Sequence, residues 1–146
     1  MIKFFKTENK VNFVDDNNVF VGYDLEHSCC ERADWFIMRR PVDFIPNYIE
    51  ELKLQEFDGD EYQFDPSYFK SLYHARRDPY DEYWSDSYNA LEAGGMVIFR
   101  MIVQHSHYPN PLHGSKYLHL FNCQNGYYCH GFEFKINDKV IKSGSL

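Results

Sequence analysis

The sequence predicts an α+β fold that is predominantly antiparallel β-sheet, of the roll, sandwich or partly open barrel type, with one to three short helices in the middle third. The composition is the first reason: 13 Phe and 12 Tyr outnumber 9 Leu and 4 Ala, and aromatic rings suit a pleated sheet better than a helical bundle. The second reason is the repeated alternation of apolar and polar residues between turn formers. With 146 residues, the chain is long enough to bury a core of its own, so we expect one domain over residues 1–146.

The clearest strands near the N-terminus form a predicted hairpin. Residues 11–14 alternate apolar and polar side chains, residues 15–18 are turn formers, and residues 19–23 resume the β pattern. A third strand is expected at residues 35–38, a short apolar run that ends before Pro41.

The last third of the chain predicts three or four further antiparallel strands. Residues 96–103 are an apolar run and residues 117–121 form a second one. Asn125-Gly126 predicts a tight turn, residues 132–136 alternate strictly, and Asn137-Asp138 predicts a turn into residues 139–141.

Helical signals are confined to the middle of the chain. Apolar residues at i, i+3, i+4 and i+7 predict a short helix over residues 45–52, and Asp65-Pro66 predicts the N-cap and first turn of another. Residues 79–93 fit either a capped helix or a loop, and their Asp, Ser and Asn content slightly favours the loop.

The charge excludes some classes of partner. A formal net charge of −7 repels phosphate backbones and anionic membranes, so we expect no nucleic-acid binding through a basic face. No apolar run approaches the roughly 18 residues of a membrane span, and no signal-peptide pattern is present. We therefore expect a cytoplasmic protein with free thiols, since the spacing of its four cysteines suits a disulfide framework poorly.

Two stretches carry a resemblance to a known group of proteins. Cys29-Cys30-Glu31 follows the strand at residues 19–25, and Asn125-Gly126-Tyr127-Tyr128 lies within residues 118–132. Together they resemble a group of small uncharacterised bacterial and phage proteins that carry a Cys-Cys-Glu motif near the start and an Asn-Gly-Tyr-Tyr motif near the end. The resemblance covers about half of the chain and implies a compact β-rich domain, without an activity or catalytic residues.

The same two motifs give the first candidate binding site. A pocket would form if the two segments met in space, because tyrosines can bridge core and water while thiol, imidazole and carboxylate groups supply polar contacts. The structural interpretation of the first motif is one cysteine in the core and the other partly exposed, because adjacent residues of an extended segment face opposite ways. That of the second motif is a tight turn. The candidate residues are Cys29, Cys30, Glu31, Asn125, Tyr127, Tyr128 and His130.

A second, alternative site would be a zinc centre in the last third. His105, His107, His119 and Cys123 are chemically competent ligands. Their spacing matches no established zinc motif, and loop histidines with buried thiols explain the same residues. We therefore expect no cofactor, with zinc as the alternative.

A third candidate is an interaction loop around Tyr80, Tyr83 and Trp84. Acids and aromatic rings are mixed there, as on many protein-binding surfaces, although a covering loop or half-buried helix explains them equally well. The expected partner is another protein or a second copy of the chain.

These observations favour a non-enzymatic binding or protein-interaction domain. The absence of an assembled catalytic motif and the acidic, aromatic loop are its basis. The alternative is a metal- or thiol-dependent enzyme that uses the His and Cys residues of the last third.

Overall fold

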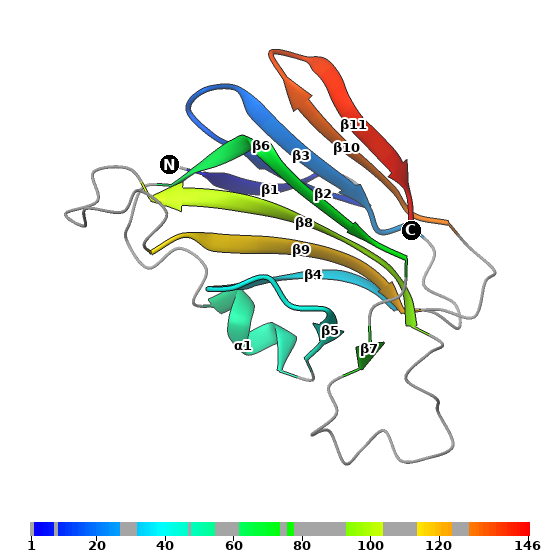
Figure 1. Cartoon of the computed structure of the whole chain (residues 1–146). Coiled ribbons are helices and arrows are strands. Elements are labelled where there is room, and N and C mark those ends of the chain that lie inside the picture. The colour runs from blue at the N-terminus through cyan, green and yellow to red at the C-terminus, as the bar shows by residue number, and fades with distance from the viewer. Residues whose placement is uncertain are drawn as a thin grey trace.

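The computed structural model describes residues 2–7, 9–26, 32–46, 48–54, 62–73, 76–77, 93–103, 114–123 and 129–146. These residues are mostly antiparallel β-strand, as the composition predicts (Figure 1). In chain order the elements are β1 (Lys3–Thr7), β2 (Lys10–Val14), β3 (Val19–Asp24), β4 (Arg32–Met38), β5 (Phe44–Ile45), α1 (Ile49–Leu54), β6 (Tyr62–Leu72), β7 (Arg76–Arg77), β8 (Ala93–Val103), β9 (Lys116–Cys123), β10 (Gly131–Ile136) and β11 (Lys139–Ser145).

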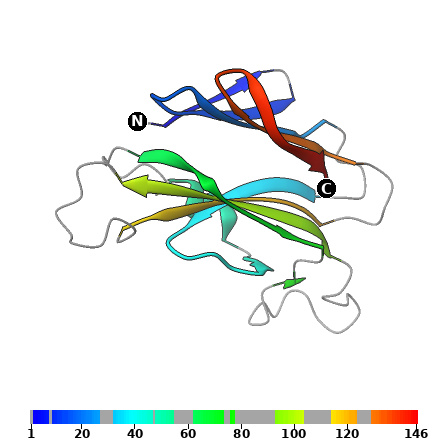
Figure 2. The same cartoon turned by 45° about the horizontal axis from the view of Figure 1, so that its top comes forward.

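Two antiparallel sheets form the body of the molecule. Sheet A has the strand order β1-β2-β3-β10-β11, and sheet B has the order β4-β9-β8-β6. The sheets lie one above the other (Figure 2), and a short parallel pair, β5 with β7, lies outside both. The strands predicted at residues 11–14, 19–23, 35–38, 96–103, 117–121, 132–136 and 139–141 are confirmed.

Two of the three predicted hairpin turns lie in the described residues and have local causes, whereas Asn125-Gly126 lies outside the described residues. Asn137 and Asp138 adopt φ values of 50° and 66°, as a type I′ turn requires, and Asn and Asp tolerate this conformation better than most residues. In the first hairpin, Asn18 adopts a φ of 58°. Both turns therefore suit the twist of the strands that they join.

Aromatic rings fill the core between the sheets. Phe13 of sheet A meets the edge of Trp35 of sheet B at 4.9 Å between ring centroids, and Phe99 meets Phe134 at 5.1 Å. The buried hydroxyl of Tyr23 donates a hydrogen bond of 2.8 Å to the carbonyl of Phe121 and so joins the two sheets. The excess of aromatic residues is therefore used to fill the space between two pleated surfaces.

Asp15 fastens the first turn to the opposite sheet. One carboxylate oxygen accepts hydrogen bonds from the main-chain nitrogens of Asn17 and Val19, both at 2.9 Å. The other accepts from the nitrogen of Phe64 in β6, also at 2.9 Å. A buried carboxylate with three main-chain donors is a structural bond between layers.

A second, smaller core lies on the other side of sheet B. It brings Phe36, Ile98 and Phe121 of the sheet against Val42, Ile45 and Ile49. In Figure 1, α1 and β5 lie on that side of sheet B. The two faces of sheet B are thus both buried in large part, whereas sheet A has a core on one face.

The prediction of a helix that begins at Asp65-Pro66 is wrong, because these residues lie within β6. The register of β6 against β8 is interrupted between Phe64 and Phe69. Within this irregular stretch, one Asp65 oxygen accepts from the nitrogen of Ser67 at 2.9 Å, and the other accepts from Arg100 at 3.2 Å. An aspartate that accepts from a nitrogen two residues on makes the same local contact at a helix start and in an Asx-turn, which is why the sequence signal misled.

The same contacts hold Asp65 ionised. Its partial burial raises the pKa, but the hydrogen bonds from Ser67 and the Arg100 guanidinium more than offset this, and the pKa lies below its ordinary value. Of the one to three helices expected, the described residues contain one, α1, which begins after Pro46 and not with it. No helix in the described ranges is long and apolar enough to cross a membrane.

Candidate functional site

Most of the residues singled out by sequence motifs lie outside the described part of the chain. This holds for Cys29, Cys30, Glu31, Asn125, Tyr127 and Tyr128, for the loop residues Tyr80, Tyr83 and Trp84, and for His105 and His107. The ambiguous segment at residues 79–93 is described only at residue 93, where β8 begins. Cys123 ends β9.

His130, the described member of the first candidate site, is fully buried. Its ring nitrogen Nδ1 lies 2.7 Å from the carbonyl oxygen of Asp24, and its main chain exchanges two hydrogen bonds with Leu146 at 3.0 and 2.9 Å. These contacts join the end of β3 to the residues that flank β10 and β11. In the described residues, His130 therefore helps to hold the C-terminal end of the chain against β3.

His119, a candidate zinc ligand, is also fully buried, and both of its ring nitrogens are engaged. Nε2 accepts a hydrogen bond of 3.1 Å from the nitrogen of Val42, so Nδ1 carries the proton and donates to the carbonyl of Tyr117 at 2.9 Å. The ring stacks on Phe36 at 4.4 Å. Burial lowers the pKa of His119 from 6.5 to about 3, although hydrogen bonds to the main chain of Tyr117 and Phe36 oppose the change.

Neither ring nitrogen of His119 has a free lone pair for a metal, because Nε2 accepts from Val42 and Nδ1 carries the proton. Within the described ranges, no group of three or more His, Cys, Asp or Glu side chains is placed to hold a metal ion. His119 instead anchors the segment after β4 on sheet B.

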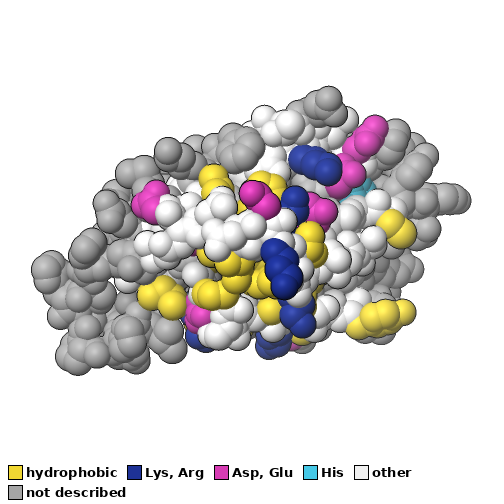
Figure 3. Space-filling model, turned by 90° about the horizontal axis from the view of Figure 1, so that it is seen from above, with side chains coloured by type: hydrophobic (Ala, Val, Ile, Leu, Met, Phe, Trp, Pro, Cys, Tyr) yellow, Lys and Arg dark blue, Asp and Glu magenta, His cyan; other side chains and the backbone are white. Residues whose placement is uncertain are grey.

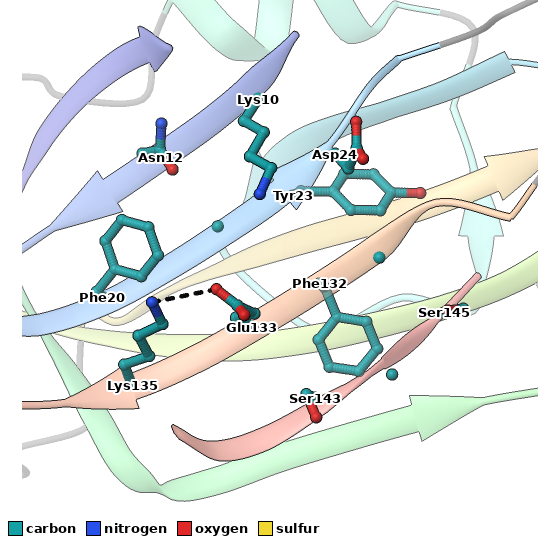
Figure 4. A pocket seen from close by; sticks show the side chains of 13 residues that line it. Lys10, Asn12, Phe20, Tyr23, Asp24, Phe132, Glu133, Lys135, Ser143 and Ser145 are labelled. Carbon is teal, nitrogen blue, oxygen red and sulfur yellow. Dashed lines mark ion pairs between the residues drawn. The ribbon is translucent and has the colours of Figure 1, made fainter. Parts of the chain in front are cut away.

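A different site appears on the face of sheet A that points away from the core. It is a hollow of about 510 Å³, within the range of ligand-binding clefts. We call it the sheet A hollow (Figure 4). Its outward-facing residues are Lys10, Asn12, Phe20, Gly22, Asp24, Gly131, Glu133, Lys135, Ser143 and Ser145.

The strand register arranges these side chains in rows across the sheet. Asn12 pairs with Gly22, Gly22 with Glu133, and Glu133 with Ser143. Because directly paired residues point to the same face, this row crosses four strands at the centre of the hollow.

The neighbouring rows lie two residues to either side. On one side Lys10 pairs with Asp24, and Gly131 pairs with Ser145. On the other side, Phe20 pairs with Lys135. The polar side chains of the hollow therefore come from two distant parts of the sequence, residues 10–24 and 131–145.

Two glycines form its floor. A Cβ atom at Gly22 would lie 2.8 Å from the Phe20 ring and 3.2 Å from the Asn12 amide oxygen, so neighbouring side chains already occupy that space. A Cβ at Gly131 would meet only the carbonyl of Gly144, at 3.8 Å, and would point into the hollow. The absence of a side chain at Gly131 thus deepens the hollow, although the surrounding structure has room for a Cβ atom there.

Opposite charges lie next to one another in the hollow. Lys135 forms an ion pair of 3.2 Å with Glu133, and its ammonium lies 5.3 Å from the centre of the Phe20 ring. Lys10 and Asp24 add one charge of each sign. Seen from the side of sheet A, both signs also lie among hydrophobic side chains (Figure 3).

The sequence motifs missed this site. It depends on the pairing of β3 with β10, more than a hundred positions apart, which no local pattern reveals. One signal was available: Gly22 interrupts an otherwise regular strand, and a glycine inside a strand often marks a close approach or a ligand.

Comparison with known proteins adds no relative. No protein-family model, no curated protein and no solved structure matches this chain.

Proposed function

We propose that this chain is a non-enzymatic binding domain whose ligand occupies the sheet A hollow. The ligand class is a neutral molecule rich in hydroxyl groups, such as a saccharide unit. The observation that carries the proposal is the charge balance of the hollow, in which Lys10 and Lys135 are matched by Asp24 and Glu133.

The balance argues against strongly charged ligands. A phosphate group would be attracted by the two lysines but repelled by the two carboxylates at similar range. A cation would be attracted by the carboxylates and repelled by the lysines. A hydroxyl group both donates and accepts, so it can satisfy an ammonium and a carboxylate together. The hydroxyls of Ser143 and Ser145 extend the same mixture of donors and acceptors to the edge of the sheet.

The position of the hollow favours binding over catalysis. It lies on an open sheet face, where the ligand keeps part of its hydration, whereas electrostatic catalysis is strongest in sites that exclude water. We also propose that the two sheets form an open sandwich, which is supported by the aromatic core shared between them.

The test fills the hollow without disturbing the strands. Gly131→Val adds a side chain suited to a strand, and only ordinary contact meets its Cβ. The matched control is Lys70→Val, an exposed substitution in β6 of the other sheet. The probes are neutral mono- and oligosaccharides and their phosphorylated counterparts, followed by amide chemical shifts and calorimetry.

We expect a neutral saccharide to shift amides of β2, β3, β10 and β11, and the phosphorylated form to bind no better. Gly131→Val should weaken binding by at least about tenfold, while Lys70→Val leaves it unchanged. Shifts outside the hollow, equal binding by Gly131→Val, or no binding by any neutral saccharide would overturn the proposal.

A further inference from the structure

β11 is the last strand of sheet A in the described part of the chain, and its outer edge pairs with no described strand. All seven of its residues are exposed. Val140 and Ile141 are 45% and 38% exposed, which places two large apolar side chains in water at one end of this strand. An exposed edge strand with apolar side chains is a template for another strand.

The hydrogen-bond register shows which main-chain groups face outward. His130 and Leu146 exchange both of their main-chain hydrogen bonds. In an antiparallel ladder such pairs alternate with pairs that exchange none, so Ser145 opposite Gly131 and Ser143 opposite Glu133 belong to the second kind. The N–H and C=O groups of Ser143 and Ser145 therefore point away from β10, toward the open edge.

The charges of β11 have one sign. Lys139 and Lys142 lie in this strand, which contains no acid. Both pair with residues of the core-facing side, Ile136 and Phe134, so both lie on the face directed toward sheet B. There the Lys142 ammonium lies 5.6 Å from the centre of the Phe69 ring.

This pattern disfavours a second copy of the chain as the occupant. An antiparallel pair of two β11 strands would place lysines of one copy close to lysines of the other, and like charges across a strand pair are destabilising. Lysines and a bulge are also the devices that protect edge strands from unspecific pairing, and β11 has both, since its register shifts between Phe134 and Lys135.

We propose that β11 accepts an extended acidic segment of another protein by strand addition. Ser143 and Ser145 supply main-chain hydrogen bonds, and alternate acids of the segment lie beside Lys139 and Lys142. Its intervening apolar residues lie on the opposite face, beside Val140. The affinity comes from the ladder, and the lysines select the acidic partner.

The test uses the full chain and two capped eight-residue peptides, one alternating Glu and Val and one alternating Lys and Val. We expect the acidic peptide to shift the amides of Ser143 and Ser145 and to slow their hydrogen exchange, with binding that weakens as salt is added. The basic peptide should bind at least about tenfold more weakly.

Two variants separate main-chain pairing from charge. Ser143→Pro removes an outward donor without removing a bond to β10, and it should abolish binding of the acidic peptide. Should that variant misfold, the double change Lys139→Glu and Lys142→Glu still tests the proposal. This variant should bind the basic peptide more tightly than the acidic one. Lys70→Glu, an exposed charge reversal in β6 of the other sheet, is the control for a change of charge away from β11.

Equal binding of both peptides, unchanged binding by the charge-reversed variant, or shifts away from β11 would overturn the proposal. Self-association of the free chain through β11 would do the same. Lys139 and Lys142 do not line the sheet A hollow, so the charge-reversed variant should keep saccharide binding, and a failure here is distinct from a failure of the proposed function.

Discussion

The buried His119 predicts a defined loss of stability in mild acid. In the unfolded chain its pKa is near the ordinary 6.5, and in the folded chain burial holds it at about 3. As the pH falls through 6.5, the unfolded state takes up a proton that the folded state refuses. The contribution of His119 to stability is therefore complete above pH 6.5 and declines as the pH falls toward 3.

The size of the effect follows from proton uptake by the unfolded chain. Between about pH 7 and about pH 5 the folded histidine stays neutral, so the loss depends on the unfolded pKa alone and amounts to about 2 kcal/mol. Most carboxylates remain ionised in this window, which limits their contribution.

The assay is urea unfolding at both pH values for the parent protein and for His119→Gln, whose amide replaces the ring without titrating. Other titrating groups contribute equally to both proteins, so the parent should lose about 2 kcal/mol more than the variant. A nitrogen-15 titration of the parent ring gives the same information if the variant is unstable. Equal losses in the two proteins, or a ring that protonates in the folded state above pH 5, would refute the reasoning.

Two further predictions concern buried hydrogen bonds. Asp15→Asn places an amide where two carboxylate oxygens accept from both the first turn and Phe64, and it should lower the free energy of unfolding by about 2 kcal/mol; urea unfolding beside the exposed Glu51→Gln checks this, and a loss no larger than that of the control would contradict it. Tyr23→Phe leaves the carbonyl of Phe121 without its 2.8 Å donor and should cost about 1 kcal/mol with an unchanged urea m-value. A fully stable Tyr23→Phe protein would show that this bond contributes nothing net.

The strands could be predicted because their signal is local. A strand with one face in a core alternates every second residue, and Phe132 and Phe134 against Glu133 display that alternation directly. The turn at Asn137-Asp138 was equally local, because the residues themselves favour positive φ.

The errors arose where one local contact serves two structures. Asp65 accepts hydrogen bonds from Ser67 in an irregular strand. The pairing of β6 with β8 and the contact with Arg100, thirty-five positions away, depend on distant residues that a local pattern does not reveal. The sheet A hollow could not be predicted from the sequence for a related reason. Gly22 and Glu133 are brought together only by the pairing of β3 with β10.

The two proposed surfaces meet in one strand. Ser143 and Ser145 direct their side chains to the hollow face and their main-chain groups to the open edge. A segment added beside β11 would widen sheet A by one strand and place every second side chain along the rim of the hollow. Ligand and peptide would then contact each other, so each should change the affinity of the other by the same factor. This reciprocity distinguishes one composite site from two independent ones, because independent sites would leave the saccharide affinity unchanged when the acidic peptide is bound.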